Sequence, residues 1–238
     1  MESVTAGILK KIEDAEIQTD PFDHLVIDNL LPDDFYKGLA KELAAEDFPS
    51  NYTRGSYGNK ERFGVDITDY STWDASGRKI STEVHRGNYE ALVSGKSDNI
   101  KLFVQLLLKN DKELHSLLGS KLPTEKFQDN YFFHVSMVKD WVGYEIEAHC
   151  DSAVNIYTIL FYAPETDVNK EFGLHVYEDA PTQLGVRTID FTPNRMVIFA
   201  PSCPNQERPP TWHEVRRLSE ELVGARNSFQ MFFYKNHE

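Results

Sequence analysis

From about residue 128 onward, the chain is a succession of short apolar segments separated by Pro, Gly and Asn. In the first of them, NYFFHVSMVKDW, one set of alternate positions holds Tyr131, Phe133, Val135 and Met137, and the other holds His134 and Ser136. This is the period of a β-strand. The segments that follow are VNIYTILFYAP, FGLHVYED, RTIDFT, NRMVIFAP, TWHEVRRL and RNSFQMFFYK. Many short strands at regular spacing are typical of a sandwich, a jelly roll or a barrel.

The first 127 residues are predicted to be mostly helical. An amphipathic helix is expected at the N-terminus, and DHLVIDNLLPDDFYKGL predicts a strand through Ile27 followed by a helix with Pro32 at its first position. Residues 78–120 also have mainly helical patterning, whereas 49–77 form a long polar stretch predicted to be a functional or mobile loop. We therefore expect one domain over 1–238, α+β and mainly β, with helices from 1–127 packed against a β core at 128–238.

The charge of the chain limits its partners. It carries 38 acidic and 25 basic side chains, a net charge of −13, which argues against binding to nucleic acid or to an anionic membrane. No apolar run is long enough to span a bilayer, and the N-terminus lacks the apolar core of a secretory signal, so we expect a cytoplasmic protein. Only Cys150 and Cys203 are present, which excludes a disulfide framework and a Cys-based zinc site. A monomer or a homodimer is expected.

Three residues are candidate metal ligands. His149 and Asp151, in EAHCDSAVN, share one face of an extended chain, with Cys150 on the other face. The best third ligand is His213 in TWHEV, on another predicted strand. Two imidazoles and one carboxylate form the facial triad of non-haem Fe(II) oxygenases, which leaves coordination positions open.

A candidate anchor for an acidic ligand follows the third metal ligand. In GARNSFQMFFY, Arg226 and Ser228 share a strand face. A guanidinium binds a carboxylate through two parallel hydrogen bonds, and a nearby hydroxyl can add another. An Arg in this position suits a dicarboxylate whose other end chelates the iron.

Taken in order, these motifs resemble the 2-oxoglutarate/Fe(II)-dependent dioxygenases, in particular the prolyl-4-hydroxylase-like branch. The matching segments are GYEIEAHCDS, YTILFYAP, FGLHVYE, PNRMVIFAPS, TWHEV and GARNSFQMFFY, together with the entry segment PFDHLVIDNLLPDDFYKGL. The resemblance implies a double-stranded β-helix (jelly-roll) core, with iron on His149, Asp151 and His213. It also implies that Arg226 forms a salt bridge with 2-oxoglutarate and that Ser228 assists.

The implied reaction is hydroxylation of an unactivated C–H bond, with release of succinate and carbon dioxide. The cofactors implied are Fe(II), 2-oxoglutarate and dioxygen, with ascorbate a further candidate. The substrate is a small molecule, an amino acid or a peptidyl proline. An Asp rather than a small residue at 151 favours hydroxylation over halogenation.

The chain departs from the family pattern in two places. Many relatives have a tyrosine that supports 2-oxoglutarate where this chain has Phe161, with Tyr157 and Tyr162 close by, so that role is left unassigned. The pair of small residues that often precedes the GLHVY-like strand is Phe-Gly here, which would narrow the mouth of the site.

Other interpretations remain open. The main alternative is a jelly-roll protein that binds a metal or ligand without turnover. A second is a zinc hydrolase, but hydrolysis has no need of an anchor such as Arg226. A third is a nucleic-acid demethylase, but such an enzyme should have basic patches, and none is evident in the sequence. His134, Lys139 and His175 are expected to be packed or surface residues. The 49–77 stretch is either a flexible insertion or a substrate lid, whose candidate residues are Tyr52, Arg54, Tyr57 and Arg62.

Overall fold

A computed structural model describes residues 2–46, 61–67, 98–180 and 182–235 of the chain. Its helices are α1 (Glu2–Asp14), α2 (Asp33–Ala45), α4 (Asp98–Lys109) and α5 (Asp111–Lys121). Its strands are β1 (His24–Ile27), β2 (Arg62–Asp66), β3 (Tyr131–Asp140), β4 (Ile146–His149), β5 (Asn155–Tyr162), β6 (Leu174–Tyr177), β7 (Arg187–Ile189), β8 (Arg195–Phe199), β9 (Trp212–Val215) and β10 (Arg226–Lys235). The predicted α+β, mainly β fold class is confirmed. Within the described ranges, no helix is long and apolar enough to cross a membrane.

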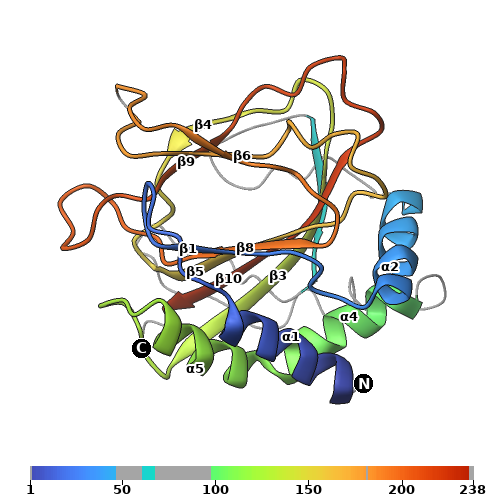
Figure 1. The fold of residues 1–238 in the computed structure, drawn as a ribbon, viewed down its shortest axis with the longest axis horizontal. Coiled ribbons are helices and arrows are strands. Elements are labelled where there is room, and N and C mark those ends of the chain that lie inside the picture. The colour runs from blue at the N-terminus through green and yellow to red at the C-terminus, as the bar shows by residue number, and fades with distance from the viewer. Residues whose placement is uncertain (1, 47–60, 68–97, 181, 236–238) are drawn as a thin grey trace.

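The strands form two antiparallel sheets that face each other (Figure 1). The larger sheet has the order β1-β8-β5-β10-β3-β2, and the smaller has the order β4-β9-β6-β7. Apolar side chains from both sheets belong to one buried cluster, among them Leu160 and Val197 of the larger sheet and Val176 and Val215 of the smaller. The two sheets therefore pack face to face.

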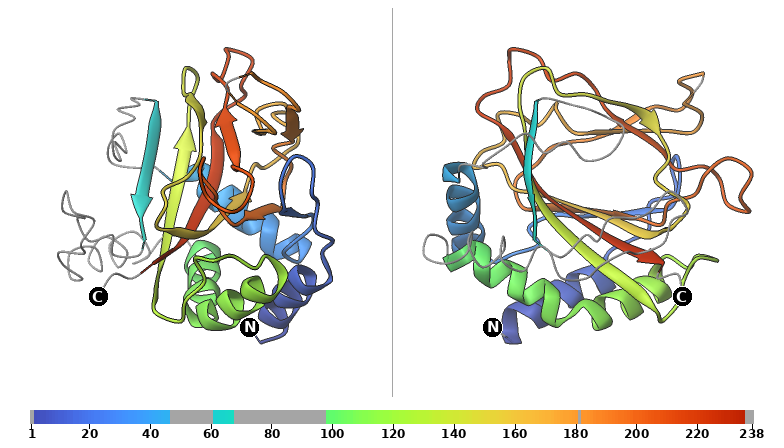
Figure 2. Two further views of the ribbon diagram at one scale, coloured as in Figure 1. Left: turned by 90° about the vertical axis from the view of Figure 1, so that its left-hand side faces the viewer. Right: turned by 180° about the vertical axis from the view of Figure 1, so that it is seen from behind.

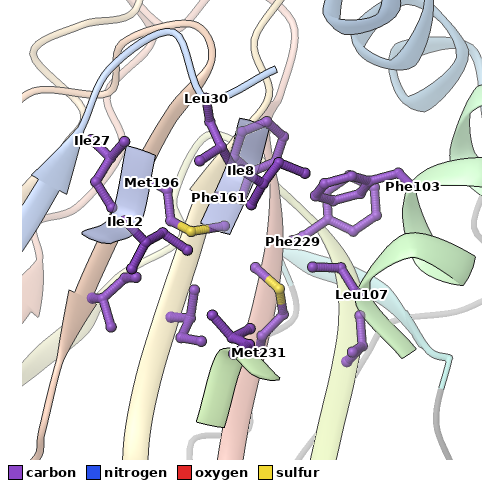
Figure 3. Packing of buried hydrophobic residues seen from close by; sticks show 14 of the residues in the cluster. Ile8, Ile12, Ile27, Leu30, Phe103, Leu107, Phe161, Met196, Phe229 and Met231 are labelled. Carbon is purple, nitrogen blue, oxygen red and sulfur yellow. The ribbon is translucent and has the colours of Figure 1, made fainter. Parts of the chain in front are cut away.

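Helices α1, α4 and α5 lie along the outer face of the larger sheet, as both views of Figure 2 show. Side chains from this face pack against them: the ring of Phe103 in α4 lies 5.0 Å from that of Phe161 and 4.8 Å from that of Phe229 (Figure 3). Phe229, Met231 and Phe233 alternate along β10 and all belong to this outer cluster. The alternation leaves the intervening positions of β10 directed between the sheets.

The residues of β10 and β3 that point between the two sheets include several polar side chains. Arg226, Ser228 and Gln230 alternate with the outer cluster on β10, as Ser136 and Asp140 do on β3. Arg226, Ser228, Ser136 and Asp140 are buried. The space between the sheets thus combines an apolar cluster with a set of buried polar side chains.

The predicted N-terminal half needs two corrections. Residues Arg62–Asp66, expected to lie in a long loop, form β2, which pairs with β3 at the edge of the larger sheet. The sequence gives little sign of this strand because its pairing depends on free backbone groups along the edge of β3. Pro32 is the N-cap residue of α2, one position before the predicted place. The rest of the 49–77 stretch apart from 61–67, including Tyr52, Arg54 and Tyr57, lies outside the described residues, and so does the helical pattern at 78–97.

Candidate metal centre and cosubstrate pocket

The fold brings the three predicted metal ligands together. His149 ends β4 and is the cross-strand partner of His213 in β9, while Asp151 follows two residues after His149. Asp151 Oδ1 lies 3.7 Å from Nε2 of His149 and 3.6 Å from Nε2 of His213. One ligand atom from each residue falls within 4.8 Å of the others. Over the residues the structure describes, no second group of three such side chains has this spacing.

Hydrogen bonds at the opposite ring nitrogens orient both imidazoles. Nδ1 of His149 lies 2.8 Å from the carbonyl oxygen of Glu147, and Nδ1 of His213 lies 2.9 Å from that of Thr211. A carbonyl can only accept, so each Nδ1 carries the proton, and Nε2 is the ring nitrogen that could bind a cation. This is the arrangement in which metal-binding histidines are usually found.

The electrostatics of the group favour an ionised carboxylate. Burial raises the pKa of Asp151, but His213 and His149 outweigh that effect and hold its pKa below the ordinary range. Burial lowers the pKa of His213, but the carboxylate of Asp151 outweighs it and raises this pKa. Asp151 therefore stays ionised beside two imidazoles, and a carboxylate in that state can bind a divalent cation.

Sequence reasoning missed a residue that supports this group. Thr158, on the inner face of β5, donates a hydrogen bond from Oγ1 to Oδ2 of Asp151 at 2.5 Å. The bond occupies one carboxylate oxygen and leaves Oδ1 directed at the two imidazoles. The alternation of Thr158, Leu160 and Tyr162 along β5 was a usable signal, but it does not by itself say which face is the inner one.

Cys150 does not belong to the group, in agreement with its expected position between two ligands. The three side chains grouped within ligand distance are His149, Asp151 and His213. Burial raises the pKa of the Cys150 thiol to about 12, so without a metal it is protonated at neutral pH. The thiol of Cys203 instead contacts the backbone, donating to the carbonyl oxygen of Asp151 at 3.1 Å.

Arg226 and Ser228 lie on the same inner face, at the start of β10. The Arg226 side chain is 2% exposed, and its Nε donates to the carbonyl oxygen of Phe172 at 2.8 Å. Its guanidinium carbon lies 5.3 Å from the ring centre of Tyr162 and 5.0 Å from that of Phe191. The hydroxyl of Ser228 is buried and has no hydrogen-bond partner among the described residues.

The structure distinguishes the three aromatic residues left unassigned on β5. Phe161 packs outward against α4, and the hydroxyl of Tyr157 donates to the carbonyl oxygen of Leu122 at 3.1 Å. Only Tyr162 shares the inner face with Ser228, its cross-strand partner. Its hydroxyl, too, is buried without a hydrogen-bond partner in the described part of the chain. Burial raises the pKa of Tyr162 despite the nearby Arg226, which keeps the phenol protonated and able to donate.

Two further charged residues beside Arg226 were not predicted as site residues. Asp140, at the end of β3, is fully buried and accepts from Nη1 of Arg226 at 3.0 Å. It also accepts from Nε and Nη2 of Arg62, at 2.6 and 3.0 Å. Arg62 was considered only as part of a lid, but it lies in β2 and points into the interior.

The remaining polar candidates have structural roles. Lys139 is buried and donates from Nζ to the carbonyl oxygens of Ala44 and Glu46, at the C-terminal end of α2. His175 lies on β6 with Nδ1 3.0 Å from the hydroxyl of Thr188. His134 is buried on β3, its ring stacked 6.1 Å from that of Phe232.

No protein-family model and no curated protein matches the sequence. Comparison of the fold finds several similar structures. A prolyl-4-hydroxylase from Pseudomonas putida superposes with a TM-score of 0.55 at 14% identity, covering 98% of this chain and 100% of that one. The dioxygenase for auxin oxidation 1 of Arabidopsis thaliana, solved with 2-oxoglutarate, gives a TM-score of 0.57 at 15% identity, covering 96% and 88%.

A third similar structure is a prolyl hydroxylase from Trichoplax adhaerens in complex with a peptide of the hypoxia inducible factor oxygen degradation domain. It superposes with a TM-score of 0.53 at 15% identity, covering 98% of this chain and 90% of that one. At such identities the likeness concerns the fold. The chain has the fold of the 2-oxoglutarate/Fe(II)-dependent oxygenases, and the solved structures that share this fold include prolyl hydroxylases.

Proposed function

We propose that this chain is an Fe(II)- and 2-oxoglutarate-dependent dioxygenase that hydroxylates an unactivated C–H bond of a small molecule, an amino acid or a peptidyl substrate. The observation that carries the proposal is the composition of the interior. A His-Asp-His group lies between the same two sheets as a buried arginine flanked by two hydroxyls without partners. A metal site alone would not need the second feature.

The described residues fit the metal. His149 and His213 would bind it through Nε2, and Asp151 through Oδ1, because the opposite atoms of these side chains are already hydrogen-bonded. Three protein ligands leave the remaining positions for a cosubstrate and oxygen. The same donor set can hold zinc, so the donors alone do not establish oxygenase chemistry.

The side chains around Arg226 suit the far carboxylate of 2-oxoglutarate. The Arg226 guanidinium would bind it as a charged pair, and the hydroxyls of Tyr162 and Ser228 would donate to it. Buried hydroxyls without partners are costly, and a carboxylate placed between them would satisfy both. A zinc hydrolase has no use for such an anchor.

The order of the strands supports a double-stranded β-helix for the core. From β3 to β10 the chain passes back and forth between the two sheets, and the eight strands fall into the orders β8-β5-β10-β3 and β4-β9-β6-β7. This arrangement would place the metal ligands on the smaller sheet and the anchor residues on the larger one, with the cosubstrate between them. Iron with 2-oxoglutarate supplies the oxidising chemistry, and the protein supplies binding and orientation.

The test is formation of succinate from 2-oxoglutarate by the full chain with Fe(II), with mass spectrometry of each candidate substrate for one added oxygen atom. The panel should include a proline-containing peptide, free amino acids and small carboxylic acids, because the similar structures include a peptide-bound hydroxylase and an auxin dioxygenase. We expect Asp151→Ala to reduce succinate formation more than about 100-fold, since it removes a metal ligand. Asp167→Ala, which removes an exposed carboxylate, is the matched control.

Two results would contradict the proposal. Undiminished succinate formation by Asp151→Ala would exclude the metal assignment. Binding of both Mn(II) and 2-oxoglutarate by the wild type, without succinate under any condition, would favour a non-catalytic binding protein instead.

A further inference from the structure

One buried carboxylate beside the candidate anchor is shared by two guanidinium groups. Asp140 is 0% exposed and binds Arg226 (2% exposed) and Arg62 (14% exposed). A ligand carboxylate that binds Arg226 would therefore compete with Asp140 for the same guanidinium.

The way Asp140 is shared decides that competition. Arg62 takes both oxygens of Asp140, Oδ1 through Nε at 2.6 Å and Oδ2 through Nη2 at 3.0 Å. Arg226 contacts only Oδ2. If Arg62 were absent, the Asp140 carboxylate would be left to Arg226 alone and would form a closed, neutral ion pair with it. In that state Asp140 would compete with any ligand carboxylate for the same guanidinium.

The position of Arg62 is itself well fixed. Its guanidinium carbon lies 4.2 Å from the ring centre of Tyr144, and its Nη1 donates to the side chain of Gln230 at 3.4 Å. Arg62 is paired with Asp140 in the β2–β3 register, so the backbone ladder and the ion pair hold the same two residues together.

From this arrangement we infer that Arg62 is a positioning residue for the cosubstrate: by binding both oxygens of Asp140, it leaves the guanidinium of Arg226 available for the distal carboxylate of the ligand. The inference rests on the proposed function, because it takes that ligand to be 2-oxoglutarate. It makes the edge strand β2 part of the active site without requiring that Arg62 touch the cosubstrate. It also predicts a preference for ligands that bring a negative charge to this end.

The experiment is calorimetric binding to the full chain with Mn(II) in place of Fe(II), so that no turnover occurs. The two probes are 2-oxoglutarate and 2-oxovalerate, which keeps the same chain length and 2-oxo acid end but has a methyl group in place of the distal carboxylate. We expect Arg62→Gln to weaken binding of 2-oxoglutarate about tenfold, the size of one charge-assisted hydrogen bond. Binding of 2-oxovalerate should change less than about twofold, because it has no charge at that end.

A double variant tests the charge argument directly. Arg62→Gln combined with Asp140→Asn removes one charge of each sign and restores the single positive charge on Arg226. Its affinity for 2-oxoglutarate should return to within about threefold of the wild type. The control is Arg187→Gln, which breaks an exposed pair with Asp20, made through Nε at 3.0 Å and Nη2 at 2.8 Å, and should alter neither affinity.

The possible failures are distinguishable. If the wild type does not prefer 2-oxoglutarate to 2-oxovalerate, the anchor and the proposed function are both wrong. If the wild type has the preference and Arg62→Gln keeps it in full, only the role of Arg62 is wrong. Equal weakening of both probes would mean that Arg62 is merely structural, and a double variant as weak as Arg62→Gln would exclude the charge mechanism.

Discussion

Tyr162 of β5 and Ser228 of β10 are cross-strand partners, and each buries a hydroxyl that has no hydrogen-bond partner among the described residues. Leaving such a group unsatisfied costs about 1–3 kcal/mol. Two of them side by side, next to the guanidinium of Arg226, are difficult to explain by packing alone. A ligand carboxylate that accepts from both is the simplest reason for their presence.

Tyr162→Phe should therefore separate stability from binding. We expect the free energy of unfolding without ligand to stay the same or rise by up to about 1 kcal/mol, because an unsatisfied group is removed. The affinity for 2-oxoglutarate with Mn(II) should fall about five- to tenfold. Denaturant titration and calorimetry measure the two quantities.

Tyr157→Phe is the matched control for this prediction. Its hydroxyl is already bonded to the carbonyl oxygen of Leu122, on the side away from the metal. That variant should lose about 1 kcal/mol of stability and keep its affinity for 2-oxoglutarate. A Tyr162→Phe protein that behaves like Tyr157→Phe would show that Tyr162 does not contact the cosubstrate.

Thr158→Val should weaken metal binding without removing a ligand. The substitution preserves the shape of the side chain but deletes the hydrogen bond from Oγ1 to Asp151 Oδ2, which leaves that oxygen free to rotate toward either imidazole. Loss of such a supporting bond typically costs about 10- to 100-fold in metal affinity. Competition for Mn(II) with a calibrated chelator measures the change, and an unchanged affinity would mean that the bond does not orient the carboxylate.

The sequence was informative where alternation along one strand was enough. It predicted that Arg226 and Ser228 share a face, and the structure confirms this arrangement on β10. Alternation could not choose between Phe161 and Tyr162, because the inner face of β5 is fixed only by its register against β10. The register between β5 and β10 is therefore needed to tell which side chains of β5 face the interior.

The Arg62–Asp140 pair shows a second limit. These residues are 78 positions apart, and Arg62 lies in a polar stretch whose composition predicts a loop. The strand that contains Arg62 forms because the edge of β3 offers backbone groups for pairing. The guanidinium of Arg62 can be buried there because it forms an ion pair with Asp140. Both causes belong to the folded sheet, so neither leaves a local signal in the sequence.

His115 should make the protein less stable in mild acid. Its ring is buried and stacked between Phe127 and Tyr131, with centroids 4.5 and 4.0 Å away, and burial lowers its pKa from 6.5 to about 4. Between these values the unfolded chain binds a proton that the folded protein does not. The stability contributed by the neutral ring is therefore complete above pH 6.5 and is lost as the pH falls toward 4.

His115→Phe isolates this effect. The variant cannot take up the proton and replaces a ring nitrogen that has no hydrogen-bond partner among the described residues. From pH 7 to pH 4.5 the wild type should lose up to about 2 kcal/mol more free energy of unfolding than the variant. Denaturant titrations at several pH values test this, and parallel pH profiles would mean that His115 is not the group responsible.

Gly173→Ala should destabilise the smaller sheet. A Cβ at Gly173 would lie 2.0 Å from the carbonyl oxygen of Ile189 and 2.8 Å from its carbonyl carbon, both backbone atoms of the neighbouring strand β7. Since no flexible side chain can move aside, β6 and β7 must separate, at a cost of about 1–3 kcal/mol or more. This close approach also explains why Gly follows Phe172 directly before β6.

Gly7→Ala is the comparison that separates this clash from a general effect of removing glycine. A Cβ there meets nothing within 4 Å, and the residue lies inside α1, so alanine should stabilise the helix by up to about 1 kcal/mol. Thermal and denaturant unfolding of the two variants should therefore shift in opposite directions. If Gly173→Ala were as stable as the wild type, β6 and β7 would not be in the close contact that aligns Leu174 with Ile189.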